Sequence, residues 1–261
     1  MKNELFSIGP LTIHGYGLMI GIGVLLCIYM GMFRAKRNGL KEEAVLDIAI
    51  WGLVAGFLGA KVLFVIVEWE TFLTDPMRVL GSEGFVVYGG IIAGVLSAIL
   101  YCRVKKLVFL QYFDLCAPSI ALAQGFGRIG CFLAGCCYGR ETDGAFCVVF
   151  PEGSLAPAGV PLLPTQLLSS AGNFLIMAIL LWFSKRNRHT GDTGFLYMLL
   201  YGVGRFFLEF LRNDDRGDVG ALSTSQFISV FIVAAAIILL LKNRRTKADE
   251  EKVEEKHEAA E

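Results

Sequence analysis

The chain has 261 residues, of which 55% are hydrophobic and 18% are charged, and its formal net charge is zero. A soluble protein of this size is nearer half apolar and a quarter charged, and zero net charge gives no reason to expect a nucleic-acid partner. The charged residues gather in short clusters between long apolar runs, which favours a polytopic membrane protein over a soluble all-helical one.

Seven apolar runs follow one another, and each approaches the roughly 20 residues that a helix needs to cross a bilayer. They cover residues 13–33, 48–67, 85–102, 115–138, 167–183, 194–211 and 221–241. The first run is longer than the apolar core of a signal peptide, so we expect it to remain as a helix. The sequence therefore predicts an all-α membrane domain over residues 1–241 with a short insertion at about 139–164, and a charged cytoplasmic tail over 242–261.

Basic residues are unevenly divided between the two sides of the predicted helices. Fourteen follow the first, third, fifth and seventh runs: Arg34, Lys36, Arg37, Lys41, Arg103, Lys105, Lys106, Lys185, Arg186, Arg188, Lys242, Arg244, Arg245 and Lys247. Five lie at the opposite ends: Lys2, Arg78, Arg140, Arg212 and Arg216. The positive-inside rule then places the N-terminus outside and the C-terminus in the cytoplasm, which requires an odd number of spans and agrees with seven.

Three cations lie inside apolar runs, where an ionisable group is costly and marks a functional site by default. Lys61, Arg128 and Arg205 occur 13, 13 and 11 residues after the starts of the second, fourth and sixth runs. At a rise of about 1.5 Å per residue, each lies roughly 16–20 Å from the inner boundary. The sequence therefore predicts that the three cations share one depth in the outer half of the membrane.

A single carboxylate, Glu209, lies close to these cations in the sequence. It follows Arg205 by four residues and can meet it on one helix face, which Tyr201 and Arg212 extend. One carboxylate cannot neutralise three cations, so we expect an anion, and a phosphate suits guanidinium groups. The alternative is that Lys61 extends its ammonium outward to the interface and that Arg205 pairs with Glu209 alone.

Polar aromatic residues open the first and third runs, which start at the predicted outer surface. His14 and Tyr16 begin the first, and Tyr88 with Gly89 and Gly90 begins the third. The adjacent glycines allow another backbone or a lipid to approach closely. The alternative is that both tyrosines are ordinary interfacial residues.

The fourth run carries Gly125, Gly127, Gly130 and Gly135 around Arg128. This pattern predicts a kinked or broken helix whose backbone N–H groups face an anion. Close packing against a neighbouring helix explains the same glycines equally well.

Four of the seven cysteines, Cys131, Cys136, Cys137 and Cys147, follow Arg128 closely. Their spacing is not that of a zinc ribbon and the chain has only three histidines, so simple packing is favoured over a disulfide or a metal site. We expect no metal and no cofactor.

Two segments resemble the signatures of the bacterial prolipoprotein diacylglyceryl transferase family: residues 127–140 read GRIGCFLAGCCYGR, and residues 201–212 read YGVGRFFLEFLR. Residues 14–18 (HGYGL) look like the family's N-terminal motif, and 59–61 (GAK) and 89–94 (GGIIAG) fit two further motifs. Lys61 stands where the family commonly has arginine. The resemblance covers nearly the whole chain in order.

The resemblance implies a seven-helix enzyme of the bacterial cell membrane, with its N-terminus outside and its active site facing the outer leaflet. Such an enzyme moves the diacylglyceryl group of phosphatidylglycerol onto the thiol of a prolipoprotein lipobox cysteine, the first step of lipoprotein maturation. By motif match, Arg128, Arg205, Tyr88 and Glu209 are the expected catalytic residues. The expected phosphatidylglycerol-binding residues are Arg128, Arg205, Tyr16, His14, Lys61, Tyr201, Gly89 and Gly90.

The chain departs from the family pattern at positions that bear on the acceptor chemistry. Tyr88 stands where the family usually has a histidine that is favoured as general base, and a phenol with a pKa near 10 is a poor base, so His14 is an alternative. Cys131 replaces an asparagine, and residues 163–169 read LPTQLLS in place of a more polar run.

Three other functions are alternatives to the transferase. One is a related phospholipid-dependent transferase with another acceptor. Another is a transporter of an anionic lipid or metabolite, which the lack of an inverted repeat disfavours. The third, an intramembrane protease, is disfavoured because no serine lies in a nucleophile motif with a partner histidine in a span.

Overall fold

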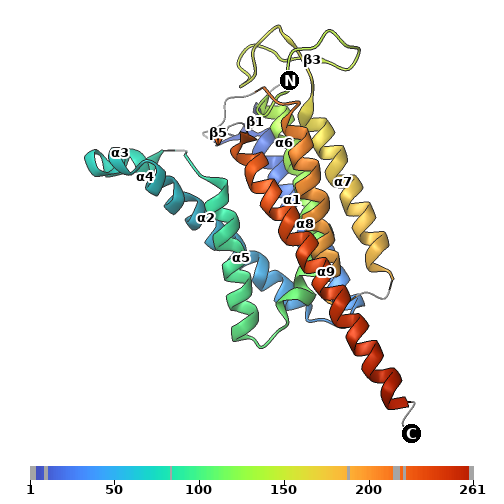
Figure 1. The fold of residues 1–261 in the computed structure, drawn as a ribbon. Helices are drawn as coiled ribbons and strands as arrows, with labels where there is room; N and C mark the ends of the chain where they lie inside the picture. Colours follow the sequence, from blue (N-terminus) through green and yellow to red (C-terminus); the bar gives the residue numbers. More distant parts are fainter. Residues whose placement is uncertain are drawn as a thin grey trace. The chain divides into compact units, whose positions relative to one another are not determined.

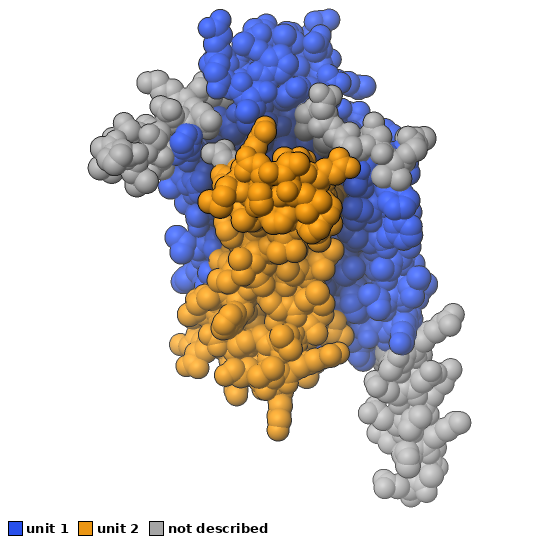
Figure 2. Space-filling view, turned by 90° about the vertical axis from the view of Figure 1, so that its left-hand side faces the viewer, with its two compact units in different colours: residues 1–30, 113–261 blue, residues 31–112 orange. Residues whose placement is uncertain are grey.

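The computed structural model describes residues 4–8, 11–82, 84–186, 189–213, 218–219 and 222–258. The chain forms two compact units, which Figure 2 colours separately. Unit 1 comprises residues 1–30 and 113–261, and unit 2 comprises residues 31–112. Each unit is described on its own below, and the single domain expected over 1–241 stays a prediction.

Seven helices of 18 or more residues occur in the described part of the chain, one for each predicted apolar run (Figure 1). They are α1 (Gly15–Arg37), α2 (Glu42–Val67), α5 (Val87–Val104), α6 (Phe109–Ala134), α7 (Thr165–Ser184), α8 (Asp192–Glu209) and α9 (Thr224–Glu258). The short helices α3 (Trp69–Thr74) and α4 (Pro76–Gly81) follow α2. α9 continues through most of the predicted tail.

Five of these helices are long and apolar enough to cross a membrane, so the protein is polytopic. They are Gly15–Arg37, Glu42–Val67, Val87–Val104, Thr165–Ser184 and Thr224–Arg244. The other two, α6 and α8, carry Arg128, Arg205 and Glu209. Charged side chains lower the hydropathy of a helix, and α6 and α8 are not among the five apolar helices. The count of seven spans therefore stays a prediction.

Three short antiparallel hairpins correct the expectation of an all-α chain, which is instead mostly helical. They are β1 (Glu4–Ile8) with β2 (Leu11–His14), β3 (Val148–Val149) with β4 (Pro161–Leu162), and β5 (Asp218–Val219) with β6 (Leu222–Ser223). Four of these six strands have two residues each, which is too short for an alternating pattern to be read from sequence.

Helix α6 is continuous, although its glycine pattern predicts a break. It runs through Gly125 and Gly130 without interruption and ends at Ala134. A Cβ atom at Gly125 would lie 2.6 Å from the ring of Phe174 on α7, and one at Gly130 would lie 3.1 Å from the carbonyl oxygen of Tyr16 on α1. These glycines therefore let neighbouring helices approach, as the packing alternative held.

Polar side chains fix α6 against α7 and α8 within unit 1. The Ser170 hydroxyl of α7 donates to the Gly125 carbonyl at 2.9 Å, and the Tyr197 hydroxyl of α8 donates to Gln124 at 3.0 Å. One turn earlier on α8, the Asp114 carboxylate accepts the Gly194 N–H at 2.7 Å. Since buried polar groups require partners, these bonds set the register of the three helices.

Unit 2 is built on a close pair of helices, α2 and α5. A Cβ atom at Gly59 would lie 2.6 Å from the carbonyl oxygen of Gly89, and one at Gly90 would lie 2.9 Å from the carbonyl oxygen of Gly56. Both helices therefore need glycine at the crossing, as small residues permit close approach of membrane helices.

Candidate functional site

The first turn of α9 carries a capping box, one residue of which also contacts Glu209 at the end of α8. The Ser223 hydroxyl accepts the Gln226 N–H at 3.2 Å, and the Gln226 side chain accepts the Ser223 N–H at 3.1 Å. This reciprocal arrangement satisfies two backbone donors at the helix start. The same Ser223 hydroxyl donates to Oε1 of Glu209 at 3.0 Å, which ties the start of α9 to the end of α8.

Glu209 lies buried between two arginines. Its Oε2 atom is 3.3 Å from Nη2 of Arg205 and 4.0 Å from Nη1 of Arg212, and its side chain is 3% exposed. Arg205 also donates to the Ser225 hydroxyl of α9 at 2.9 Å. The predicted pairing of Arg205 with Glu209 on one helix face is therefore confirmed.

Arg128 and Arg205 line the same cavity, which α6, α7 and α8 enclose. Its volume is about 40 Å³, and Tyr201, Ser169 and Asn173 also line it. One water molecule needs roughly 10–15 Å³ on the same measure, so the cavity accommodates a small polar group. The structure thus brings together two of the three predicted cations within one unit.

Three arginines gather in this part of unit 1. Arg128 and Arg205 line the cavity, and Arg205 and Arg212 contact the buried Glu209 carboxylate. Arg128 and Arg212 both lie close enough to Cys137 to act on its thiol electrostatically. Guanidinium groups are donors whose geometry suits the oxygens of a phosphate or carboxylate.

Backbone hydrogen bonds join the two segments that resemble the family signatures. The Arg140 N–H donates to the Leu211 carbonyl at 3.0 Å, and the Asn213 N–H donates to the Tyr138 carbonyl at 3.3 Å. Between them, a Cβ atom at Gly139 would lie 2.6 Å from the Leu163 carbonyl oxygen. Only glycine fits there, which explains the Tyr-Gly-Arg sequence at the end of the first segment.

Tyr16 and His14 lie at the start of α1 and the end of β2. Tyr16 contacts α6 beside Gly130, two residues from Arg128, and 42% of its surface is exposed. His14 pairs with Glu4 in the hairpin and its side chain is exposed. Tyr16 therefore contacts the helix that carries Arg128, and the Arg128 guanidinium acts on it electrostatically.

The remaining predicted site residues, Lys61, Tyr88, Gly89 and Gly90, belong to unit 2. Nζ of Lys61 donates to the Ser82 carbonyl at 2.7 Å and lies 5.1 Å and 5.0 Å from the ring centroids of two phenylalanines. The ammonium thus has partners within its own unit, and its place in a common site with the arginines stays a prediction, as does that of the other three.

The sequence did not indicate four polar, uncharged residues of the site: Ser169, Asn173, Ser223 and Ser225. The Ser-x-x-Gln pattern at 223–226, directly before an apolar run, is a capping-box signal that could have identified Ser223. Asn173 is only 4% exposed, and its Oδ1 atom has no hydrogen-bond partner among the described residues.

The fold and the site together define a polytopic membrane protein with a partly buried cavity lined by two arginines. Residues 3–242 match the model of the prolipoprotein diacylglyceryl transferase family, and the chain belongs to that family.

Three relatives align with most of this chain. A phosphatidylglycerol–prolipoprotein diacylglyceryl transferase 2 of Clostridium perfringens is 47% identical, covering 89% of this chain and 92% of its own length. The phosphatidylglycerol–prolipoprotein diacylglyceryl transferase of Clostridium tetani is 46% identical over 89% of this chain and 94% of its own length. That of Finegoldia magna is 36% identical over 96% of this chain and all of its own length.

Proposed function

We propose that this protein transfers the diacylglyceryl group of phosphatidylglycerol to the lipobox cysteine thiol of prolipoproteins. Family membership and the named relatives support the reaction. The observation that carries the site assignment is the shared cavity of Arg128 and Arg205, next to one buried carboxylate.

The reaction needs a site that stabilises a phosphate leaving group. The acceptor sulfur forms a bond to the glyceryl carbon, the bond from that carbon to the phosphate oxygen breaks, and glycerol phosphate leaves with the electron pair. Arg128 and Arg205 offer donors to the oxygens on which negative charge grows. Glu209 holds Arg205 in place through their 3.3 Å contact.

The remaining residues are proposed to bind the lipid and to handle the thiol proton. Tyr16 and Tyr201 line the headgroup region on the α6 and α8 sides, as the contact of Tyr16 with Gly130 and the cavity position of Tyr201 suggest. The acceptor thiol must lose its proton. Tyr88 is the proposed general base that accepts this proton, with His14 as the alternative.

We propose that seven helices span the bacterial cell membrane, with the N-terminus outside and the site facing the outer leaflet. Basic residues in the last turns of α1 and α5 support this orientation. Three of the basic residues on which the predicted orientation rests, Lys2, Arg188 and Arg216, lie outside the described residues.

Rescue of lipoprotein maturation tests the proposed function. In bacterial cells depleted of their own transferase, expression of this chain should restore growth and the diacylglyceryl-modified form of a reporter lipoprotein. Membrane levels of the chain are measured in parallel. A chain that accumulates in the membrane and leaves the reporter unmodified would contradict the proposal.

A further inference from the structure

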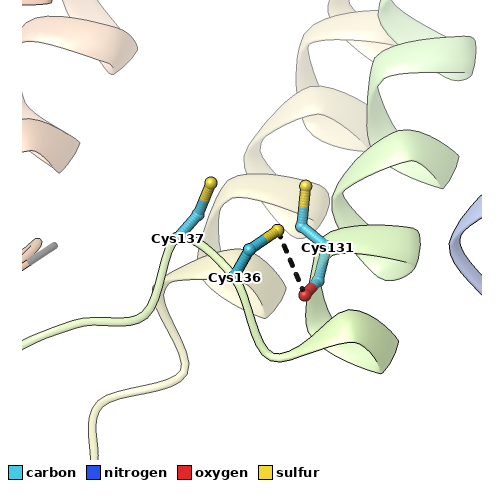
Figure 3. A group of neighbouring side chains, drawn as sticks. All are labelled: Cys131, Cys136 and Cys137. Carbon is cyan, nitrogen blue, oxygen red and sulfur yellow. Dashed lines mark hydrogen bonds between the residues drawn. The ribbon is translucent and has the colours of Figure 1, made fainter. Parts of the chain in front are cut away.

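Three cysteine sulfurs converge just beyond the end of α6. The Sγ atoms of Cys131, Cys136 and Cys137 all lie within 4.8 Å of one another (Figure 3). Cys131 is on the last turns of the helix, whereas Cys136 and Cys137 are in the loop that follows. None of the residue roles proposed above uses these three thiols.

Hydrogen bonds to α7 hold the loop that carries two of these thiols. The Thr165 hydroxyl donates to the Cys137 carbonyl at 2.8 Å, and the Gln166 side chain donates to the Cys136 carbonyl at 2.8 Å. Thr165 and Gln166 are 2% and 1% exposed. The Cys136 N–H donates to the Cys131 carbonyl at 3.1 Å. These buried donors fix the backbone, so the convergence of the sulfurs is built into the fold.

The spacing of the sulfurs is close to that of a thiolate metal site. Three sulfurs bound to one ion at about 2.3 Å lie roughly 3.8–4.0 Å apart, so small side-chain rotations would close the present separations of up to 4.8 Å. Four residues separate Cys131 from Cys136, and Cys137 follows directly, so the sequence spacing alone does not indicate this geometry. The turn at Gly135, where φ is +78°, reverses the chain and returns Cys136 and Cys137 to Cys131.

We propose that Cys131, Cys136 and Cys137 form a binding site for a thiophilic metal ion of the Zn²⁺ class. Thiolates select such ions over hard cations, and three protein ligands leave a fourth position for water. Each thiol that binds releases its proton to solvent, so a divalent ion with three thiolates carries one negative charge. Arg128 and Arg212, which act electrostatically on Cys137, offset that charge.

Cobalt substitution of the full-length protein in detergent tests the site, independently of transferase activity. Purified under reducing, anaerobic conditions, the protein should bind one Co²⁺ with sulfur-to-cobalt charge-transfer absorption, and Zn²⁺ should abolish that absorption. Cys136→Ser and Cys137→Ser should each weaken Co²⁺ binding at least about tenfold. The matched control is Cys147→Ser, because Cys147 is exposed and outside the cluster; it should bind as the wild type does.

The wild-type spectrum alone can overturn the proposal, even if the variants fold poorly. Co²⁺ without charge-transfer absorption, or the same absorption after loss of Cys136 or Cys137, would exclude a thiolate site here. A disulfide between any two of the three cysteines, found by peptide mapping of membranes lysed in an alkylating reagent, would also overturn it.

Discussion

Glu209 is the residue on which the charge balance of the site depends. It is the buried carboxylate between Arg205 and Arg212, and removing one partner of a buried ion pair costs about 3–5 kcal/mol. Glu209→Gln should therefore lower the unfolding temperature and reduce transfer at least about tenfold. Glu152→Gln, at an exposed position, is the control. Wild-type transfer by Glu209→Gln would show that the orientation of Arg205 does not depend on this carboxylate.

Tyr88 is the residue whose chemical role departs most from the family pattern. If its hydroxyl takes part in proton transfer, Tyr88→Phe should slow transfer by at least about tenfold while leaving the fold intact. The rate is measured with labelled phosphatidylglycerol and a lipobox peptide. Tyr29→Phe is a matched control, because Tyr29 is 70% exposed. An unchanged rate in Tyr88→Phe would refute a chemical role and direct attention to His14.

At the scale of elements, the joint between the two signature segments depends on Gly139. A Cβ atom there would lie 2.6 Å from the Leu163 carbonyl oxygen and 2.9 Å from that of Leu211, and backbone atoms on both sides cannot both move away. Gly139→Ala should lower stability by about 1–3 kcal/mol. The control is Gly21→Ala, since a Cβ at Gly21 meets no atom within 4 Å. Equal unfolding temperatures for the two variants would contradict the packing assigned to Gly139.

The order of the long helices could be predicted because hydropathy reports burial in lipid directly. The boundaries were less accurate: α2 begins at Glu42, ahead of the apolar run at 48, because its first turn is polar. Hydropathy also singled out Arg128, Arg205 and Glu209, because a charged residue within an apolar run is conspicuous in the sequence. It missed Asn173 and the serines, which are uncharged. It also missed Ser82 and Gly84, the partners of Lys61, because no local sequence pattern indicates them.

At the scale of the whole molecule, the proposed orientation places the 139–164 insertion outside the cell. Cys147 is exposed on this insertion, and Asn38 is exposed in the turn between α1 and α2. In intact cells, a membrane-impermeant thiol reagent should label a variant that retains Cys147 as its sole cysteine. In a cysteine-free variant carrying Asn38→Cys, it should label only after the membrane is opened. The reverse pattern would invert the topology.

The central claim is that Arg128 and Arg205 together hold the phosphate of the lipid donor, and the rate of labelled diacylglyceryl transfer from phosphatidylglycerol to a lipobox peptide tests it most directly. Arg128→Ala and Arg205→Ala should each lower the rate by about 10²–10³-fold, as expected for loss of a donor to a developing negative charge. Arg78→Ala, at an exposed position on α4, should transfer at the wild-type rate. Full activity in either variant of the cavity arginines would contradict the claim.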